Sequence, residues 1–263
     1  MIPAMTETVA PPLEPPRRLH FGWLIPALFR PRATFAAIAS QTSDVWLTPL
    51  LVLMITAVLN VIAAGPIKQA AAISGQATLP PGFEFYTPEQ QAQFFQAAQA
   101  TSGPVFVYVF PAIISALSVW VGRLIVVGLL HLALTLLGGR GSARSAMNVV
   151  AWASLPFAVR DLVRIGFMIA AQRLVGHPGL SGFAPADGGG VGLFLSGMLG
   201  LFDVYLIWHI ILLVLGARHT DNLAMGKTTA GVMVTMLAMM LLQTVPGFIA
   251  AQFQELNIIR PFF

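Results

Sequence analysis

The sequence predicts an all-α membrane protein, a five-transmembrane-helix bundle with a short N-terminal interfacial helix. The first observation is composition: 57% of the 263 residues are hydrophobic and 9% are charged, whereas soluble domains carry about 25% charged residues. The second is a series of long apolar stretches, each of the roughly 20 residues that a membrane helix needs. The polar segments between them are too short to bury a core of their own, so no additional soluble domain is expected.

The chain is predicted to begin with a disordered, Pro-rich cytoplasmic tail over residues 1–20. Within residues 21–41 we expect a short helix on the membrane surface, because Pro31 fits a first helical position. An ordered linker is the alternative, since the apolar face is narrow. The side chains expected to face lipid are Leu28, Phe35 and Ile38.

Residues 21–251 are interpreted as one membrane domain with five spans. The predicted spans are residues 46–64, 104–138, 145–171, 191–216 and 229–251. Trp46 is typical of an interfacial anchor, Gly65–Pro66 is expected to end the first span, and Pro156 is expected to break the third.

The longest predicted connection is an external loop, residues 65–103. Within it, Thr87–Gln90 has the pattern of a capping box with proline at the first helical position. A short helix outside the hydrocarbon is therefore expected from Pro88. Residues 252–263 are predicted to form an external tail.

Lysine and arginine determine the predicted orientation. Eight of them fall on the side of the N-terminus and three on the other side. The eight are Arg17, Arg18, Arg30, Arg32, Arg140, Arg144, Arg218 and Lys227, and the three are Lys68, Arg173 and Arg260. We therefore expect a multi-pass protein of the inner (plasma) membrane with a cytoplasmic N-terminus and an external C-terminus.

Charged residues inside the predicted spans form the main candidate site. Arg123, Arg160 and Asp203 lie about 15, 14 and 13 residues from the cytoplasmic helix ends, so they fall at similar depth. Asp203 is the expected partner of Arg123 or Arg160, and Asp161 is expected to pair with Arg164 at i,i+3. The network either fixes helix register or forms a pathway for ions, protons or anionic lipid. Three arginines against two aspartates leave a positive charge that suits a lipid phosphate or an acidic group of a partner.

Two histidines are weaker candidates. His131 and His209 lie at equal depth on two spans, which is compatible with a shared haem or metal. Neither has a second ligand at i,i+3 or i,i+4, so they are interpreted as polar residues near the interface. The chain has no cysteine, which excludes thiolate metal sites and disulfides. No cofactor and no metal are expected.

Small residues recur at helical spacing on two spans. They are Ser118 and Gly122 on one, and Gly192, Ser196 and Gly200 on the other. Such stripes allow close helix contact, inside the bundle or with a partner.

Four short motifs follow one another along the chain. They are Phe29-Arg30-Pro31-Arg32-Ala33-Thr34-Phe35, Trp46-Leu47-Thr48-Pro49-Leu50, Gly138-Gly139-Arg140-Gly141-Ser142 and Ala153-Ser154-Leu155-Pro156. In their order and spacing, residues 28–250 resemble bacterial Yip1-domain membrane proteins. The resemblance implies five helices, a cytoplasmic N-terminus and no catalytic residues. Eukaryotic relatives act in membrane traffic and contact small GTPases, but the Asp-Leu-Tyr-Gly-Pro motif of some of them is absent here, so that role does not transfer.

The sequence favours a non-enzymatic role. Phosphate-loop, nucleophile-elbow and HExxH signatures are absent. We expect a scaffold or accessory subunit that packs on membrane lipids and on other integral membrane proteins, or on copies of itself, without nucleic acid. The alternative is a small transporter or lipid-handling protein that uses the arginine and aspartate residues inside the membrane.

Overall fold

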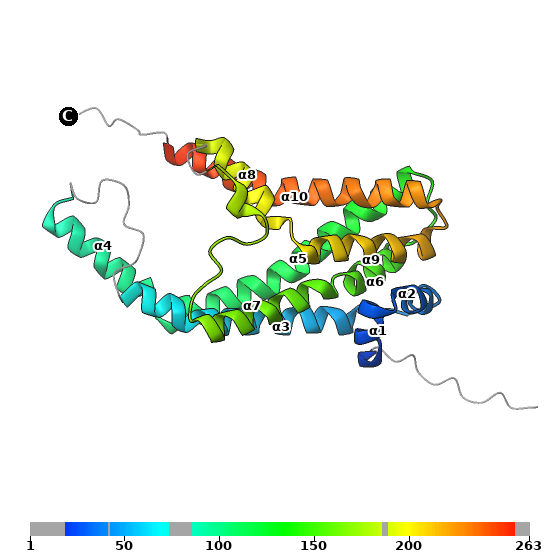
Figure 1. Ribbon diagram of the computed structural model, residues 1–263, viewed down its shortest axis with the longest axis horizontal. Coiled ribbons are helices and arrows are strands. Elements are labelled where there is room, and N and C mark those ends of the chain that lie inside the picture. Colours follow the sequence, from blue (N-terminus) through cyan, green and yellow to red (C-terminus); the bar gives the residue numbers. More distant parts are fainter. Residues whose placement is uncertain (1–18, 42, 74–85, 102, 186–188, 256–263) are drawn as a thin grey trace, which may run out of the picture.

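The computed structural model describes residues 19–41, 43–73, 86–101, 103–185 and 189–255, and this part of the chain is helical without strands. Its long helices run side by side along the long axis of the molecule (Figure 1). They are α3 (Leu47–Ile73), α5 (Phe110–Leu136), α7 (Leu155–Ala171), α9 (Val204–Asp221) and α10 (Met225–Glu255). Helix α3 packs on α5 and α7, and α10 packs on α5 and α9.

Three helical stretches of the described residues are long and apolar enough to cross a membrane. They are Leu47–Ala71, Val105–Leu136 and Met225–Ile249. A fourth span results if the bent pair Gly190–Leu201 and Val204–Asp221 counts as one. These correspond to the predicted first, second, fifth and fourth spans. Helices α6 (Ala143–Ala153, 11 residues) and α7 (17 residues) are each too short to be counted among them.

The predicted end of the first span at Gly65–Pro66 is wrong. Helix α3 continues through Pro66 to Ile73, although proline removes one helical hydrogen bond. Gly65 lies directly against the ring of Tyr108, where no side chain would fit. The Tyr108 hydroxyl also donates a hydrogen bond to Gln69 Oε1 at 3.4 Å. These contacts with η3 (Val105–Val109) support the helix beyond the proline, so the predicted loop begins with helix rather than coil.

The predicted helix in the connection that follows is confirmed. Helix α4 spans Pro88–Thr101. Its capping box is reciprocal: the Thr87 N–H donates to Gln90 Oε1 at 3.0 Å, and the Gln90 N–H donates to Thr87 Oγ1 at 3.3 Å. Helix α4 lies at the opposite end of the bundle from α1 and α2 (Figure 1). The part of the predicted external loop at residues 74–85 lies outside the described residues.

The N-terminal segment is more divided, and its apolar side chains are more buried, than expected. It consists of η1 (Phe21–Trp23), α1 (Leu24–Phe29) and α2 (Pro31–Ala39), with Pro31 at the first position of α2 as predicted. The expectation that Phe35 and Ile38 face lipid is wrong, because both are buried against the bundle. The cause is the packing of α2 against α9 and α6. The predicted tail at residues 1–18 lies outside the described residues.

The predicted third span is broken near Pro156, as expected. Helix α6 ends at Ala153 and α7 begins at Leu155, with Pro156 in its first turn. The second predicted span is η3 followed by α5. Helix α10 extends to Glu255, past residue 251, where the fifth span was predicted to end and after which the external tail was predicted to begin.

The fourth predicted span is two helices rather than one. Helix α8 (Gly189–Leu201) and α9 meet at a 59° bend. Asp203 lies at the break with φ −136° and ψ 174°, and its Oδ1 accepts a hydrogen bond from the Leu206 N–H at 2.8 Å. An aspartate at this position satisfies one of the free N–H groups of a new helix, so Asp203 begins α9 instead of lying within a continuous helix.

Helix α6 fixes the segment that precedes α3. The Trp152 side chain is fully buried, and its Nε1–H donates to the Val45 carbonyl oxygen at 3.0 Å. Asn148 accepts a hydrogen bond from the Val45 N–H at 3.1 Å and donates one to the Ser43 carbonyl oxygen at 3.2 Å. Since a buried backbone group without a partner is costly, these contacts define where the first span begins.

Asp221 joins two turns at the end of the bundle that holds α2. The Gly141 N–H donates to Asp221 Oδ1 at 3.0 Å, and the Thr220 hydroxyl donates to Asp221 Oδ2 at 2.8 Å. A side chain on Gly141 would lie 2.8 Å from Asp221 Cγ. Glycine is therefore required in this turn because the carboxylate lies directly against the backbone.

Gly141→Ala is accordingly expected to destabilise the protein by about 1–3 kcal/mol, the usual cost of overpacking. The measurement is the thermal unfolding midpoint in detergent. Gly128→Ala is the matched control, because an added methyl group at Gly128 meets nothing within 4 Å. Equal midpoints for the two variants would show that Asp221 does not hold the turn.

Candidate functional site

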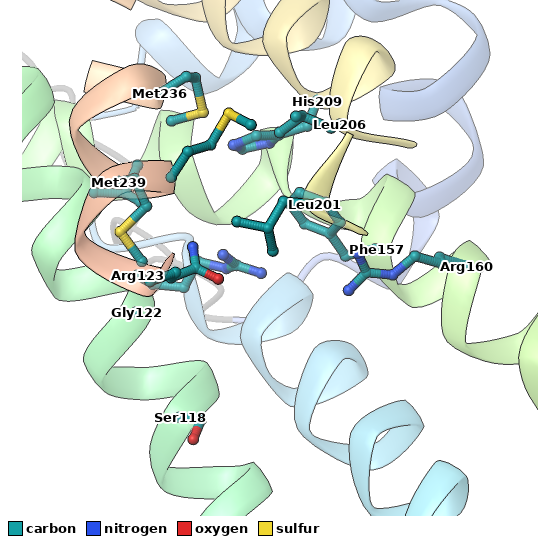
Figure 2. A pocket seen from close by; sticks show the side chains of 13 residues that line it. Ser118, Gly122, Arg123, Phe157, Arg160, Leu201, Leu206, His209, Met236 and Met239 are labelled. Atoms are coloured by element: carbon teal, nitrogen blue, oxygen red, sulfur yellow. The ribbon is translucent and has the colours of Figure 1, made fainter. Parts of the chain in front are cut away.

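A cavity of about 210 Å³ lies among α5, α7, α9, α10 and the end of α8. Its polar side chains come from four of these helices. They are Ser118 and Arg123 of α5, Arg160 of α7, His209 of α9 and Gln243 of α10. Methionine, leucine and phenylalanine side chains complete the wall, so a few polar groups converge inside an apolar enclosure (Figure 2).

Arg160 lies between two carboxylates. Its Nη1 lies 3.5 Å from Asp203 Oδ2, and its Nε lies 3.9 Å from Asp161 Oδ1. The side chains of the two aspartates are 12% and 16% exposed, so these pairs are largely shielded from solvent. Of the two partners considered for Asp203, the structure brings Arg160 to it. The break between α8 and α9 at Asp203 allows the pair with Arg160 to form, because the carboxylate can both cap α9 and reach α7.

The expected pair of Asp161 with Arg164 is not formed. Asp161 lies against Arg160 instead. Within the described residues, Arg164 makes no ion pair at 4.0 Å or less. The i,i+3 spacing of Asp161 and Arg164 permits a contact on a helix. Asp161 instead contacts Arg160, which lies between Asp161 and Asp203.

Arg123 lies in different surroundings from Arg160. Its guanidinium carbon lies 5.1 Å from the centre of the Phe157 ring, and that of Arg160 lies 4.8 Å from the same ring. Figure 2 shows the two arginines reaching toward Phe157 from different helices. In the described part of the chain, no carboxylate lies within ion-pair distance of Arg123, and its buried Nε has no hydrogen-bond partner. Among the described residues, Arg123 is thus a cation of the cavity wall without a carboxylate in direct contact.

The two histidines are not equivalent. His209 is 1% exposed, lines the cavity, and donates a hydrogen bond from Nδ1 to the Ala153 carbonyl oxygen at 2.8 Å. Its ring also packs on Phe157, with 4.9 Å between centroids. His131 does not line the cavity. The described residues contain no group of three or more His, Cys, Asp or Glu side chains arranged to hold a metal ion.

The small residues lie in two kinds of environment. Ser118 and Gly122 border the cavity and face α10. On α8, Gly192 lies against Pro185 and Gly200 against Pro178, so these two glycines contact the preceding loop rather than another long helix. Ser196 lies beside α10 and lines another pocket with Gln243 and Thr244.

Several important positions were missed in the sequence. Gly216 allows α9 to approach α6 and α2, since an added side chain would lie 2.5 Å from Val149 Cγ1 and 2.9 Å from Phe35 Cδ1. Phe157 brings both arginines onto one ring, and Gln243 contributes an amide to the cavity. Helical position alone gave no signal for these residues, because the rotation of each helix about its axis determines what it faces.

Comparison with known proteins gives one match. The model of a family described as Yip1 domain matches residues 26–245. The comparison with curated proteins and the comparison with solved structures each gave no match.

Proposed function

The chain belongs to the Yip1 domain family, and from this premise we propose that it is a non-enzymatic scaffold or accessory subunit of a larger membrane complex. The observation that carries the proposal is the outer face of η3 and α5. Large apolar side chains there are about half exposed over five helical turns. They are Val105, Phe106, Val109, Phe110, Ile113, Ile114, Leu117, Val121 and Leu124. A face of this length and composition suits both lipid and the apolar surface of another membrane protein.

We further propose five spans, with α6–α7 as the third. Its charged residues do not prevent insertion if they face protein, and Arg160 does so through Asp161 and Asp203. The buried Trp152 on α6 also supports an interior position. Five spans place the two termini on opposite sides of the membrane.

The basic turns support a cytoplasmic N-terminus in the inner membrane. Arg144 pairs with Asp44 at 3.3 Å, and Lys227 Nζ donates to the Leu137 carbonyl oxygen at 3.3 Å. These contacts bring the segment before α3, the turn after α5 and the start of α10 to one end of the bundle. Arg140, Arg144, Arg218 and Lys227 lie in or next to the turns at this end, as the positive-inside rule predicts for a cytoplasmic end.

The interfacial helix is proposed in a revised form. Phe21, Ile25 and Phe29 follow one another at i,i+4 spacing and are 58%, 71% and 71% exposed. They replace Phe35 and Ile38 as the apolar stripe available to the membrane surface.

The scaffold role predicts that the protein is recovered in stoichiometric amounts with a larger membrane complex. The experiment is extraction in mild detergent from cells that produce the tagged protein at its native level, followed by native mass determination. Ile113→Trp is expected to reduce the recovered complex at least severalfold. Ile62→Trp on α3 is the matched control, since both isoleucines are 52% exposed.

A mass equal to one chain, or to two copies of the chain and nothing else, would contradict the accessory role. An equal loss with Ile62→Trp would show that the α5 face has no special part in the complex.

A further inference from the structure

The cavity at Arg123 adjoins a groove between α5 and α10. This groove has a volume of about 490 Å³. It shares Ser118, Gly122, Met239 and Gln243 with the cavity, so the two spaces meet between these helices. The remaining walls of the groove are apolar. They are Ile114, Leu117, Val121, Ile125 and Leu242.

The cavity and the groove differ in the charge of the side chains that line them. The groove carries no charged side chain, whereas the cavity contains Arg123 and Arg160. Arg160 is balanced by Asp203 and Asp161. Arg123 has no ion-pair partner in the described residues. The Nε atoms of both arginines are buried without a hydrogen bond, so the two differ in the carboxylates that only Arg160 has. An unpaired charge at this depth is costly, and an anion that reaches Arg123 would remove that cost.

We propose that this cavity and groove bind one anionic lipid, with its carboxylate or phosphate headgroup on Arg123 and an acyl chain in the groove along α5 and α10. A guanidinium pairs well with either anion because its N–H groups match two oxygens. The apolar groove selects an amphiphile over a free inorganic anion, since only an amphiphile fills both spaces. The site goes beyond the scaffold role and does not depend on it.

Gly122 and Ser118 form the passage between groove and cavity. An added methyl group at Gly122 would meet only the end of Met239, at 3.8 Å. There is therefore room for a β-carbon at Gly122, and a larger side chain would extend into the space that the cavity and the groove share. The helix-packing stripe predicted at Ser118 and Gly122 thus has a second role, which is to admit the headgroup between α5 and α10.

The test is native mass spectrometry of the delipidated full chain in detergent, titrated separately with oleate, phosphatidic acid, phosphatidylcholine and inorganic phosphate. We expect one oleate or one phosphatidic acid per chain. Phosphatidylcholine and inorganic phosphate are expected to bind at least about tenfold more weakly. Arg123→Gln should weaken oleate binding at least about tenfold, roughly the effect of one lost hydrogen bond to a charged group. Gly122→Leu should also weaken it at least about tenfold, because the added side chain fills the passage to Arg123. Arg164→Gln is the control, because Arg164 does not line the cavity.

The thermal stability of the lipid-free protein distinguishes a structural role of Arg123 from a role in binding. If Arg123 serves to bind an anion, Arg123→Gln should keep or raise the thermal unfolding midpoint of the lipid-free protein. Arg123→Lys should retain part of the oleate binding. The proposal is overturned if Arg123→Gln binds oleate as the unmodified chain does. It is equally overturned if Arg164→Gln weakens binding as much, or if phosphatidylcholine or inorganic phosphate binds as tightly as oleate.

Discussion

Asp203→Asn is expected to lower the thermal unfolding midpoint of the detergent-solubilised protein by several degrees. Asparagine caps a helix about as well as aspartate, so the hydrogen bond to the Leu206 N–H is kept and only the charge is removed. Removal of one partner from a buried pair costs about 3–5 kcal/mol. The lower end of that range applies here, because Asp161 remains as a second counterion, with its Oδ1 3.9 Å from Arg160 Nε.

A second substitution identifies the partner. Arg160→Gln combined with Asp203→Asn should restore part of the loss, because the uncompensated cation is then removed as well. Arg123→Gln combined with Asp203→Asn is the control. It should change the midpoint of Asp203→Asn only by the effect that Arg123→Gln has alone, since Asp203 lies within ion-pair distance of Arg160 and not of Arg123. An unchanged midpoint for Asp203→Asn alone would show that the pair with Arg160 contributes nothing to stability.

Trp152→Ala is expected to have a comparable or larger effect. The side chain is fully buried between the N-terminal helices and the bundle, and truncation of a buried aromatic residue costs about 3–5 kcal/mol. It also leaves the Val45 carbonyl oxygen without the donor that lies 3.0 Å away. The thermal midpoint should fall, and the segment before α3 should become accessible to protease.

Trp152→Phe is the graded control. Phenylalanine keeps most of the ring volume and loses the hydrogen bond, whose net contribution is about 1 kcal/mol. Its midpoint should lie between those of the unmodified chain and Trp152→Ala. Equal midpoints for the two variants would mean that ring packing has no part in holding α1 and α2 to the bundle.

Local signals in the sequence predicted local structure well. The capping box at Thr87 and the proline at position 31 each mark a helix start that the structure confirms. Both depend on groups within one turn of the chain, so their physics is contained in a few neighbouring residues. The long apolar stretches likewise predicted the candidate spans at α3, α5 and α10.

Contacts between distant residues account for the errors. Helix α3 passes Pro66 because Tyr108 packs on Gly65, and α2 buries Phe35 because α9 offers Gly216 opposite it. In the candidate site, counting residues from the helix ends correctly predicted that Arg160 and Asp203 lie close enough to pair. Depth could not show that Asp203 begins a new helix or that Asp161 lies against Arg160 rather than Arg164, since that depends on helix rotation and on the 59° bend.

The five-span bundle depends most on whether α6–α7 crosses the membrane. The sequence contains no cysteine, so single cysteines can be labelled without background. Arg140 precedes α6 and Gly176 follows α7, and both are exposed. Arg140→Cys and Gly176→Cys, with Gln41→Cys as the cytoplasmic reference, are treated with a membrane-impermeant maleimide in intact cells and in inverted vesicles.

We expect Gly176→Cys to be labelled in intact cells, and Arg140→Cys and Gln41→Cys to be labelled only in inverted vesicles. Labelling of Gly176→Cys and Arg140→Cys from the same side would contradict the five-span bundle, because α6 and α7 would then enter and leave the membrane on one face.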